Sequence, residues 1–460
     1  MKGGFWTVAA AAYLGACLLL GGASAAGVAA NAFLQLVGLV LIVILLWRRD
    51  FSLADGARGP LWIGLGVLVV GLISLVPLPG GLGSGQPLRA ELLEAFRLLG
   101  TAPPSLSASL APSWTLNSLL HLIPAAAMFL LVLRLPNDER RLLPAVVMGI
   151  AGISVVLGAF QLMGGPDSPL RFYAVTNRDS PVGFFANANH EATLLLCALP
   201  LTAVLAGRMA SRRSRSKRSG GAIVSASIAV FILAGIAISG SSAGYGLALP
   251  TAVASFLIYR RTVAGRIAAG WWGALAALAL VFAFAGLQGP LGKEAFEADM
   301  SSSQPSSRRV LASTTVGIIK DSFPIGTGLG TFSTVYRRYE DPGRVTRQFA
   351  NHAHNDYLEA VLELGAAGGL LILGFLLWWG RRSYLAWTRD FEGAALARAG
   401  SVMIGIILAH SLVDYPIRTA AMVAVFALGC ALMVAPLPRR RPSEKAEEDE
   451  AEPLRHIEAV

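Results

Sequence analysis

Long apolar runs alternate with short polar connections along almost the whole chain. A helix needs roughly 20 apolar residues to cross the hydrocarbon core of a bilayer. At that length the sequence predicts about twelve spans, near 6–23, 30–47, 61–78, 115–133, 142–163, 190–207, 221–239, 243–259, 269–287, 358–379, 397–413 and 419–436. The pattern therefore predicts an all-α integral membrane protein whose membrane domain covers residues 1–438.

Basic residues occupy alternate connections between these spans. The clusters are Arg48-Arg49, Arg134 with Arg140-Arg141, the run 208–218, Arg260-Arg261 with Arg266, Arg381-Arg382, and Arg439 to Arg441. Cationic loops near the ends of spans resist translocation, so this side is expected to be cytoplasmic, together with both termini. Residues 439–460, rich in Glu, Asp and Lys, are expected to form a disordered cytoplasmic tail.

The opposite side receives three sizeable loops, at about 79–114, 164–189 and 288–357. The last is the longest and lies between spans nine and ten. Loops of more than about 15 residues are usually functional or disordered. A helical pattern from Val310 to Ile319 indicates that this loop folds against the membrane surface.

Composition agrees with a membrane protein, since 54% of the 460 residues are hydrophobic, 14% are charged, and the mean hydropathy is +0.59. The net charge of +10 is concentrated between the apolar runs, which indicates topology rather than nucleic-acid binding. Cys17, Cys197 and Cys430 all lie inside apolar runs. Their positions predict neither a disulfide framework nor a zinc site.

The segment from Asn351 to Glu359 places two histidines directly before an apolar run. Titratable groups held at a membrane surface are costly and usually functional. Asp356 and Glu359 have the spacing of a capping box, so Tyr357 is expected to open a helix. His354 would precede that helix, whose N-terminal field favours a neutral imidazole and a bound phosphate. For His352 the alternative is a polar rim residue on a wet loop.

Arg308 and Arg309 precede a glycine-rich turn, Pro324 to Phe332, in the same loop. Guanidinium groups bind phosphate oxygens in pairs, which suits a diphosphate, although a surface helix can use arginine for lipid headgroups. The turn lacks both the Walker ending and the preceding strand of a nucleotide-binding loop. Its N–H groups, including that of Gly328, can face an anion, or the turn can simply reverse the chain.

The second loop carries Arg171 and Arg178, and it leads into Asn187, Asn189 and His190 at the start of the sixth span. These carboxamides and the imidazole can bind sugar hydroxyls or cap a helix. Two tight hairpins follow, Ser239 to Gly244 and Asp414 to Arg418, the second with an expected Asp414–Arg418 pair.

These motifs together resemble the O-antigen ligase/polymerase family of integral membrane glycosyltransferases, from about Gly183 to Arg418. The resemblance is carried by Arg309, by Pro324-x-Gly-x-Gly-x-Gly-x-Phe332, by His354-Asn355-Asp356-Tyr357-Leu358 and by Gly183-Phe-Phe-Ala-Asn187-x-Asn189-His190. It implies a GT-C-like bundle in a bacterial inner membrane, without metal, cofactor or nucleotide sugar. The implied donor is a glycan on undecaprenyl diphosphate at the periplasmic face. A ligase passes that glycan to the lipid A core or a similar acceptor, and a polymerase passes it to a growing repeat unit.

In the family pattern the catalytic histidine matches His354 and the loop arginine matches Arg309. We expect an inverting transfer in which His354 takes the acceptor proton and Arg309 neutralises the diphosphate. The residues expected to bind substrate are Arg308, Asn187, Asn189, His190, His352, Asn355, Tyr357, Arg171, Arg178 and Gly328. One departure is Ser242, where the family often has an arginine, and Arg171 or Arg178 could supply that charge.

Two other classes of protein fit part of this pattern. A transporter of lipid-linked glycan would share the span count and the many glycines, but it is expected to show charge near the membrane midplane. A scaffold of an envelope-assembly complex would have the same topology without the chemistry.

Overall fold

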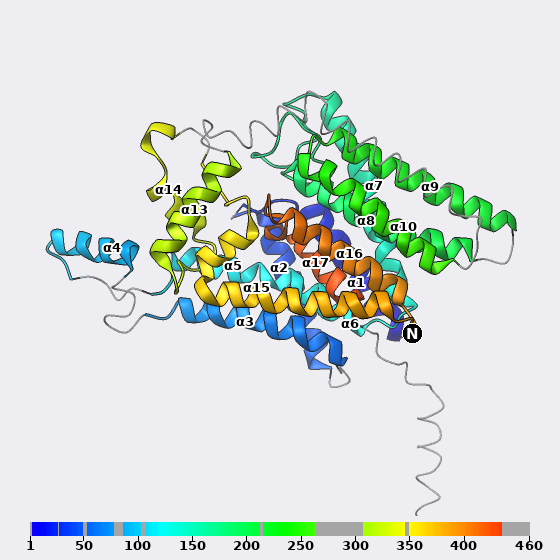
Figure 1. Ribbon diagram of the computed structural model, residues 1–460, viewed down its shortest axis with the longest axis horizontal. Helices are drawn as coiled ribbons and strands as arrows, with labels where there is room; N and C mark the ends of the chain where they lie inside the picture. The colour runs from blue at the N-terminus through cyan, green and yellow to red at the C-terminus, as the bar shows by residue number, and fades with distance from the viewer. Residues whose placement is uncertain are drawn as a thin grey trace, which may run out of the picture.

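The computed structural model describes residues 2–434 except 26, 49–52, 78–85, 103–106, 212–214, 264–306 and 346–348. In this part of the chain the regular elements are helical, and the one β contact is an isolated bridge between Pro77 and Ser107 (Figure 1). The α-helices are α1 (Lys2–Leu20), α2 (Ala29–Trp47), α3 (Arg58–Ser74), α4 (Pro87–Leu98), α5 (Pro112–Leu120), α6 (Leu122–Arg134), α7 (Leu142–Met163), α8 (Ala188–Ala210), α9 (Arg215–Ile238), α10 (Ser242–Thr262), α13 (Arg308–Ser322), α14 (Phe332–Tyr339), α15 (Asp356–Thr388), α16 (Ala394–His410) and α17 (Ala420–Leu432). Short 3-10 helices are η1 (Asp55–Ala57), η2 (Glu139–Arg141), η3 (Pro342–Arg344) and η4 (Pro416–Arg418).

Six stretches of helix are long and apolar enough to cross a membrane: α2, α5 with α6, η2 with α7, α8, α10 and α15. Five shorter apolar helices, in α1, α3, α9, α16 and α17, coincide with further predicted spans. The predicted span at 269–287 lies outside the described residues, so the count of twelve stays a prediction. Exposed apolar side chains such as Leu36 and Leu370 are typical of a surface that faces lipid.

The helix α8 lies at the centre of the bundle. Of its apolar stretch of 18 residues, 83% is buried, whereas the corresponding fraction is 28% in the peripheral helices α2 and α15. It packs against α7, α9, α10 and α16. On the other side α17 packs against α1, α6 and α16, and α15 packs against α3 and α16 (Figure 1). The main hydrophobic core is formed along these contacts.

The helix α15 has 33 residues, a length of about 50 Å at 1.5 Å per residue. A hydrocarbon core is only about 30 Å thick, so a helix of this length extends beyond it. The helix is interrupted at Gly365, whose backbone is left-handed (φ 60°, ψ −142°). Its first turns, from Asp356 to Leu364, therefore form a separate segment, and this segment carries acidic residues of the site.

A second, smaller core lies at the end of the bundle where α15 begins. It joins α4, α13 and α14 through buried side chains that include Leu88, Ile318, Phe332 and Val335. Ala353 and Leu362 belong to the same cluster, so these helices pack directly onto the loop before α15. In Figure 1 the labels α4, α13 and α14 gather at this end of the molecule. The helix predicted at Val310 to Ile319 is therefore present within α13, and the described part of the third loop, residues 307–345 and 349–355, packs on the bundle. Its position against the membrane surface stays a prediction.

Basic residues of the predicted cytoplasmic side lie at the other end of the bundle. Arg140 donates to the carbonyls of Ala431 and Val434, and Arg382 donates to that of Met433. Arg208 lies near enough to Arg141 for their charges to interact. The helices from which these residues come thus end together. Which compartment this end faces stays a prediction.

Candidate functional site

His354 lies in the loop directly before α15 and has a left-handed backbone (φ 50°), the one non-glycine residue to do so among those described. The following residue, Asn355, caps the helix, because its side chain accepts the N–H groups of Tyr357 and Leu358 at 3.0 Å each. The predicted cap at Asp356 is wrong, since Asp356 is already the first helical residue. His354 nevertheless lies just outside the positive end of α15.

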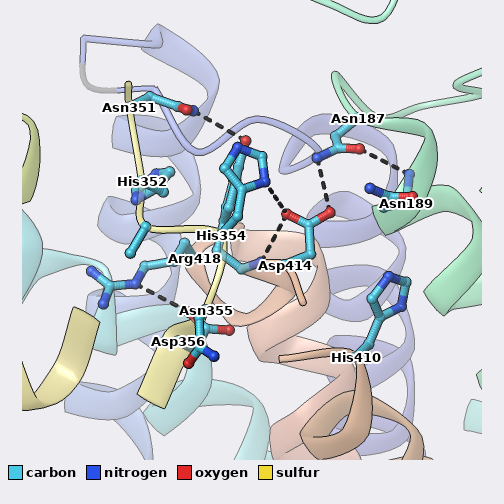
Figure 2. Close-up of polar contacts among 12 residues, drawn as sticks. Asn187, Asn189, Asn351, His352, His354, Asn355, Asp356, His410, Asp414 and Arg418 are labelled. Atoms are coloured by element: carbon cyan, nitrogen blue, oxygen red, sulfur yellow. Dashed lines mark hydrogen bonds and ion pairs between the residues drawn. The ribbon is translucent and has the colours of Figure 1, made fainter. Parts of the chain in front are cut away.

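A buried carboxylate, Asp414, faces His354 from the hairpin between α16 and α17. Its Oδ1 lies 3.1 Å from His354 Nδ1, and Asn187 Nδ2 donates to its Oδ2 at 3.3 Å (Figure 2). Burial alone would raise the pKa of Asp414, but the contact with His354 and the charges of His190 and Arg308 hold that pKa well below its ordinary range. Asp414 is therefore ionised and orients the Nδ1 side of the imidazole, which leaves Nε2 for proton transfer.

The ring of Tyr415 lies at the centre of this cluster. Its centroid is 4.2 Å from the His352 ring, 4.8 Å from the His354 ring and 5.0 Å from the His190 ring. Asn351 Nδ2 donates to the phenol oxygen at 3.1 Å, and burial raises the pKa of Tyr415, so the phenol stays neutral. The ring thus separates three imidazoles that come from two distant segments of the chain.

Of the two roles expected from the sequence for Asn187 and Asn189, the structure shows helix capping, and the binding of sugar hydroxyls stays a prediction. Asn187 caps α8 by accepting the N–H of Asn189 at 2.8 Å, while its amide group reaches Asp414. Asn189 Oδ1 accepts the hydroxyl of Ser241 at 2.7 Å, and Ser241 caps α10. His190 is buried, and neither of its ring nitrogens has a hydrogen-bond partner within the described part of the chain.

Arg418 lies beneath the same loop, surrounded by three carboxylates of α15. Its guanidinium is 3.3 Å from Asp356, 3.1 Å from Glu359 and 3.0 Å from Glu363. The expected Asp414–Arg418 pair is therefore wrong. Asp414 contacts His354, and Arg418 contacts the three carboxylates of α15. Burial lowers the pKa of Arg418, but the three carboxylates raise it beyond its ordinary value, so the guanidinium is permanently charged.

The glycine-rich turn packs on the interruption of α15. The N–H groups of Thr327 and Gly328 donate to the carbonyls of Leu362 and Glu363, at 3.0 and 2.9 Å. In return the N–H of Ala366 donates to Pro324 O at 2.9 Å. Because the Gly328 N–H is used in this way, the geometry favours the alternative in which the turn reverses the chain. The turn holds the first segment of α15 in place, and we leave Gly328 out of the proposed binding site.

The candidate arginines are distributed unequally. Arg308, at the first position of α13, is half-buried and its charge acts on Asp414 and His410, whereas Arg309 is exposed. Arg171 donates to the carbonyls of Asn177, Arg178 and Ser180, and Arg178 pairs with Asp167. These last two arginines organise their own loop.

The structure thus brings together Asn187, Asn189, His352, His354 and Asn355 (Figure 2). His190 packs against the same Tyr415 ring, and Arg308 lies near enough to Asp414 for its charge to act on it. Tyr357 donates its hydroxyl to Leu408 O at 2.8 Å and so joins α15 to α16. The sequence pattern had placed Asp414 in a hairpin pair and had given Tyr415, Glu359 and Glu363 no role in the site. The sequence feature that could have identified these residues is their position, since each is a polar residue at the end of an apolar span. No arrangement of three or more His, Cys, Asp or Glu side chains suited to a metal occurs in the described residues.

Residues 227–373 match the family model described as O-antigen ligase. This part of the chain is similar to the O-antigen ligase family. No curated protein matches the chain. The matched segment contains α10, α13, α14, the glycine-rich turn and His354, whereas Asn187, Asp414, Tyr415 and Arg418 lie outside it. The match supports the family expected from the sequence and an activity of the O-antigen ligase or polymerase type.

Proposed function

We propose that this protein is a glycosyltransferase of the O-antigen ligase type in a bacterial inner membrane. It transfers a glycan from undecaprenyl diphosphate to a sugar hydroxyl, of the lipid A core or a similar acceptor, at the periplasmic face. The observation that carries this proposal is the 3.1 Å contact of His354 with the buried carboxylate of Asp414. A carboxylate-oriented imidazole at the end of an apolar bundle is suited to general-base chemistry on a lipid-bound substrate.

The reaction is an inverting displacement at the anomeric carbon. His354 Nε2 takes the proton of the acceptor hydroxyl while the acceptor oxygen forms the new glycosidic bond. The bond from the anomeric carbon to the diphosphate oxygen breaks on the opposite face, and its electron pair leaves on that oxygen. Asp414 stabilises the imidazolium that forms and does not itself need to accept the proton.

Cationic groups stabilise the charge that develops on the diphosphate. Arg308 is the stronger candidate for this role, because its charge reaches Asp414 and His410 while Arg309 points to solvent. The carboxamides of Asn187 and Asn189 are half-exposed beside His354, where they can bind sugar hydroxyls. The polyprenyl tail of the donor would remain in the bilayer beside the apolar helices, so that only its headgroup enters the site.

The test is deletion of the gene followed by electrophoresis of the surface polysaccharide. A ligase is expected to leave lipid A core without attached chains, while undecaprenyl-linked glycan accumulates. The full chain should restore attachment, and a His354→Ala variant present at the same level in the membrane should not. Normal attachment by that variant would remove His354 from the mechanism.

The same experiment distinguishes the alternatives. Chains of a single repeat unit in the deletion strain would identify a polymerase, which the family match accommodates equally well. Lipid-linked glycan retained at the cytoplasmic face, but processed normally once exported, would identify a transporter and overturn the proposal.

A further inference from the structure

Two imidazoles, not one, are oriented by buried carboxylates at this site. His352 Nδ1 lies 2.8 Å from Glu359 Oε1, and His354 Nδ1 lies 3.1 Å from Asp414 Oδ1. The two rings pack against the same phenol ring, that of Tyr415. Both histidine side chains are partly exposed, 15% for His352 and 27% for His354. Each therefore has Nδ1 directed to a carboxylate and Nε2 left for a ligand.

The donors to Glu359 determine which atom of His352 carries a proton. Glu359 Oε2 accepts the N–H of Ala353 at 2.7 Å, and Oε1 lies 3.1 Å from the Arg418 guanidinium. A carboxylate that already accepts these donors is acceptor-only, so His352 must donate its Nδ1 hydrogen to it. When Nε2 also carries a proton, His352 becomes an imidazolium that donates outward.

The two imidazoles differ in the number of acidic groups around their carboxylates. On the side of His352, Glu359 is one of three acidic side chains, with Asp356 and Glu363, that surround the single cation Arg418. On the side of His354, Asp414 is a single carboxylate, and Arg308 lies near enough for its charge to act on it. Acidic groups are therefore more numerous around His352 than around His354. Paired titratable groups with diverging environments mark the base and the acid of a site.

The other groups near His352 do not reverse this assignment. Two of them are histidines close enough for their charges to interact with that of His352: His121, at the junction of α5 and α6, and His190, at the start of α8. The third is Tyr415, whose ring faces the imidazole. The acidic groups come from α15 and the permanent cation from η4. The balance of charge at His352 is therefore set mainly by α15 and Arg418.

The geometry points to His352 as a second catalytic residue, the acid that binds and protonates the leaving diphosphate. This inference rests on the proposed function. As the anomeric carbon–oxygen bond breaks, His352 Nε2–H donates its proton to the departing oxygen, while His354 Nε2 takes the proton of the acceptor hydroxyl. The acceptor gains the glycan, the diphosphate leaves protonated, and one proton passing from His354 to His352 through water restores the resting site.

The test uses the purified full chain in detergent, with donor lipid extracted from a deletion strain and membranes of that strain as acceptor. A pair of acid and base predicts a bell-shaped dependence of rate on pH. His352→Gln, whose amide can still donate to Glu359, is expected to lower the maximal rate about 10²-fold and to remove the alkaline limb. His352→Arg restores a permanent cation, so it should recover part of the rate and also lack that limb.

Matched variants separate this inference from the function on which it rests. His354→Gln should abolish product at every pH, and the melting temperatures of these variants should stay close to that of the unmodified protein. If His354→Gln is inactive while His352→Gln keeps the full rate, or keeps the shape of the pH profile at a uniformly lower rate, His352 is not the acid. If the unmodified protein transfers no glycan, the proposed function and the role of His352 are both overturned.

Discussion

Asp414 and His354 belong to different connections between helices of the bundle, and a contact of 3.1 Å between Oδ1 and Nδ1 joins them. His354 precedes α15, while Asp414 follows α16. The carboxylate is fully buried, yet the imidazole keeps an exposed fraction of 27%. Asp414 is therefore the inner residue, which orients the imidazole, and His354 is the outer residue, which can contact a substrate.

Replacing Asp414 by asparagine should slow glycan transfer roughly 10²-fold or more, because the amide cannot stabilise the imidazolium of His354. The rate should be measured with purified protein at saturating donor. Asp390→Asn is a matched control, since Asp390 is an exposed aspartate paired with Arg398 away from the site. A comparable loss in the control would indicate a general effect of removing a carboxylate.

The pH dependence of stability gives a second test of the same residue. Since the folded-state pKa of Asp414 is depressed, its interactions stabilise the protein at all pH values above the ordinary aspartate pKa of about 3.9. That contribution is lost only as the pH falls through the depressed pKa. The difference in melting temperature between Asp414→Asn and the unmodified protein should be constant from neutral pH to about pH 5. It should shrink only in stronger acid. A difference that vanished near pH 6 would contradict the assigned charge of Asp414.

Arg418→Gln should destabilise the fold strongly, because it leaves the carboxylates of Asp356, Glu359 and Glu363 buried without their cation. Removing one partner of a buried ion pair costs about 3–5 kcal/mol. Arg338→Gln is the control, since Arg338 pairs with Glu91 at the surface and its loss should cost less than about 1 kcal/mol. Thermal unfolding in one detergent would compare the two. Equal melting temperatures would show that Arg418 does not hold the acidic segment of α15.

Gly365 in α15 offers a test of the glycine-rich turn. A Cβ at Gly365 would overlap the Pro324 carbonyl, and its φ of 60° is unfavourable for alanine. Gly365→Ala should therefore cost at least about 1–3 kcal/mol and loosen the loop that carries His354. Gly374→Ala, in the same helix with nothing near its Cβ position, should be neutral or stabilising by up to about 1 kcal/mol. Melting temperatures and transfer rates of both variants would decide. A Gly365→Ala variant as stable and active as Gly374→Ala would show that the turn does not position the site.

The helices were predictable because their signal is local. Runs of apolar residues such as 190–207 and 221–239 match α8 and α9 to within a few residues at most of their ends. The family was predictable for a similar reason, since His354 and the glycine-rich turn carry recognisable spacings. Both inferences need only the order of residues along the chain.

The partners of the site could not be predicted in the same way. Asp356 was expected to cap α15, but its carboxylate accepts from Ser411 at 2.8 Å and lies beside Arg418, so Asn355 caps the helix instead. Asp414 and Arg418 were expected to pair because they are close in sequence. Arg418 is the last residue of η4, and each of the two meets a side chain from a distant segment of the chain. Tertiary contacts of this kind decide between local alternatives that the sequence leaves equal.

Arg308 and Arg309 provide the most discriminating prediction, because they are adjacent and chemically identical. Arg308 is half-buried and near enough to Asp414 and His410 for its charge to act on both, while Arg309 is exposed. Arg308→Gln should lower the maximal rate about 10²–10³-fold, as expected for loss of a group that stabilises developing charge. Arg309→Gln should leave it nearly unchanged, and neither should move the melting temperature much. Steady-state rates at saturating donor would compare the two variants. The reverse order would assign the diphosphate to Arg309, as the family spacing predicts.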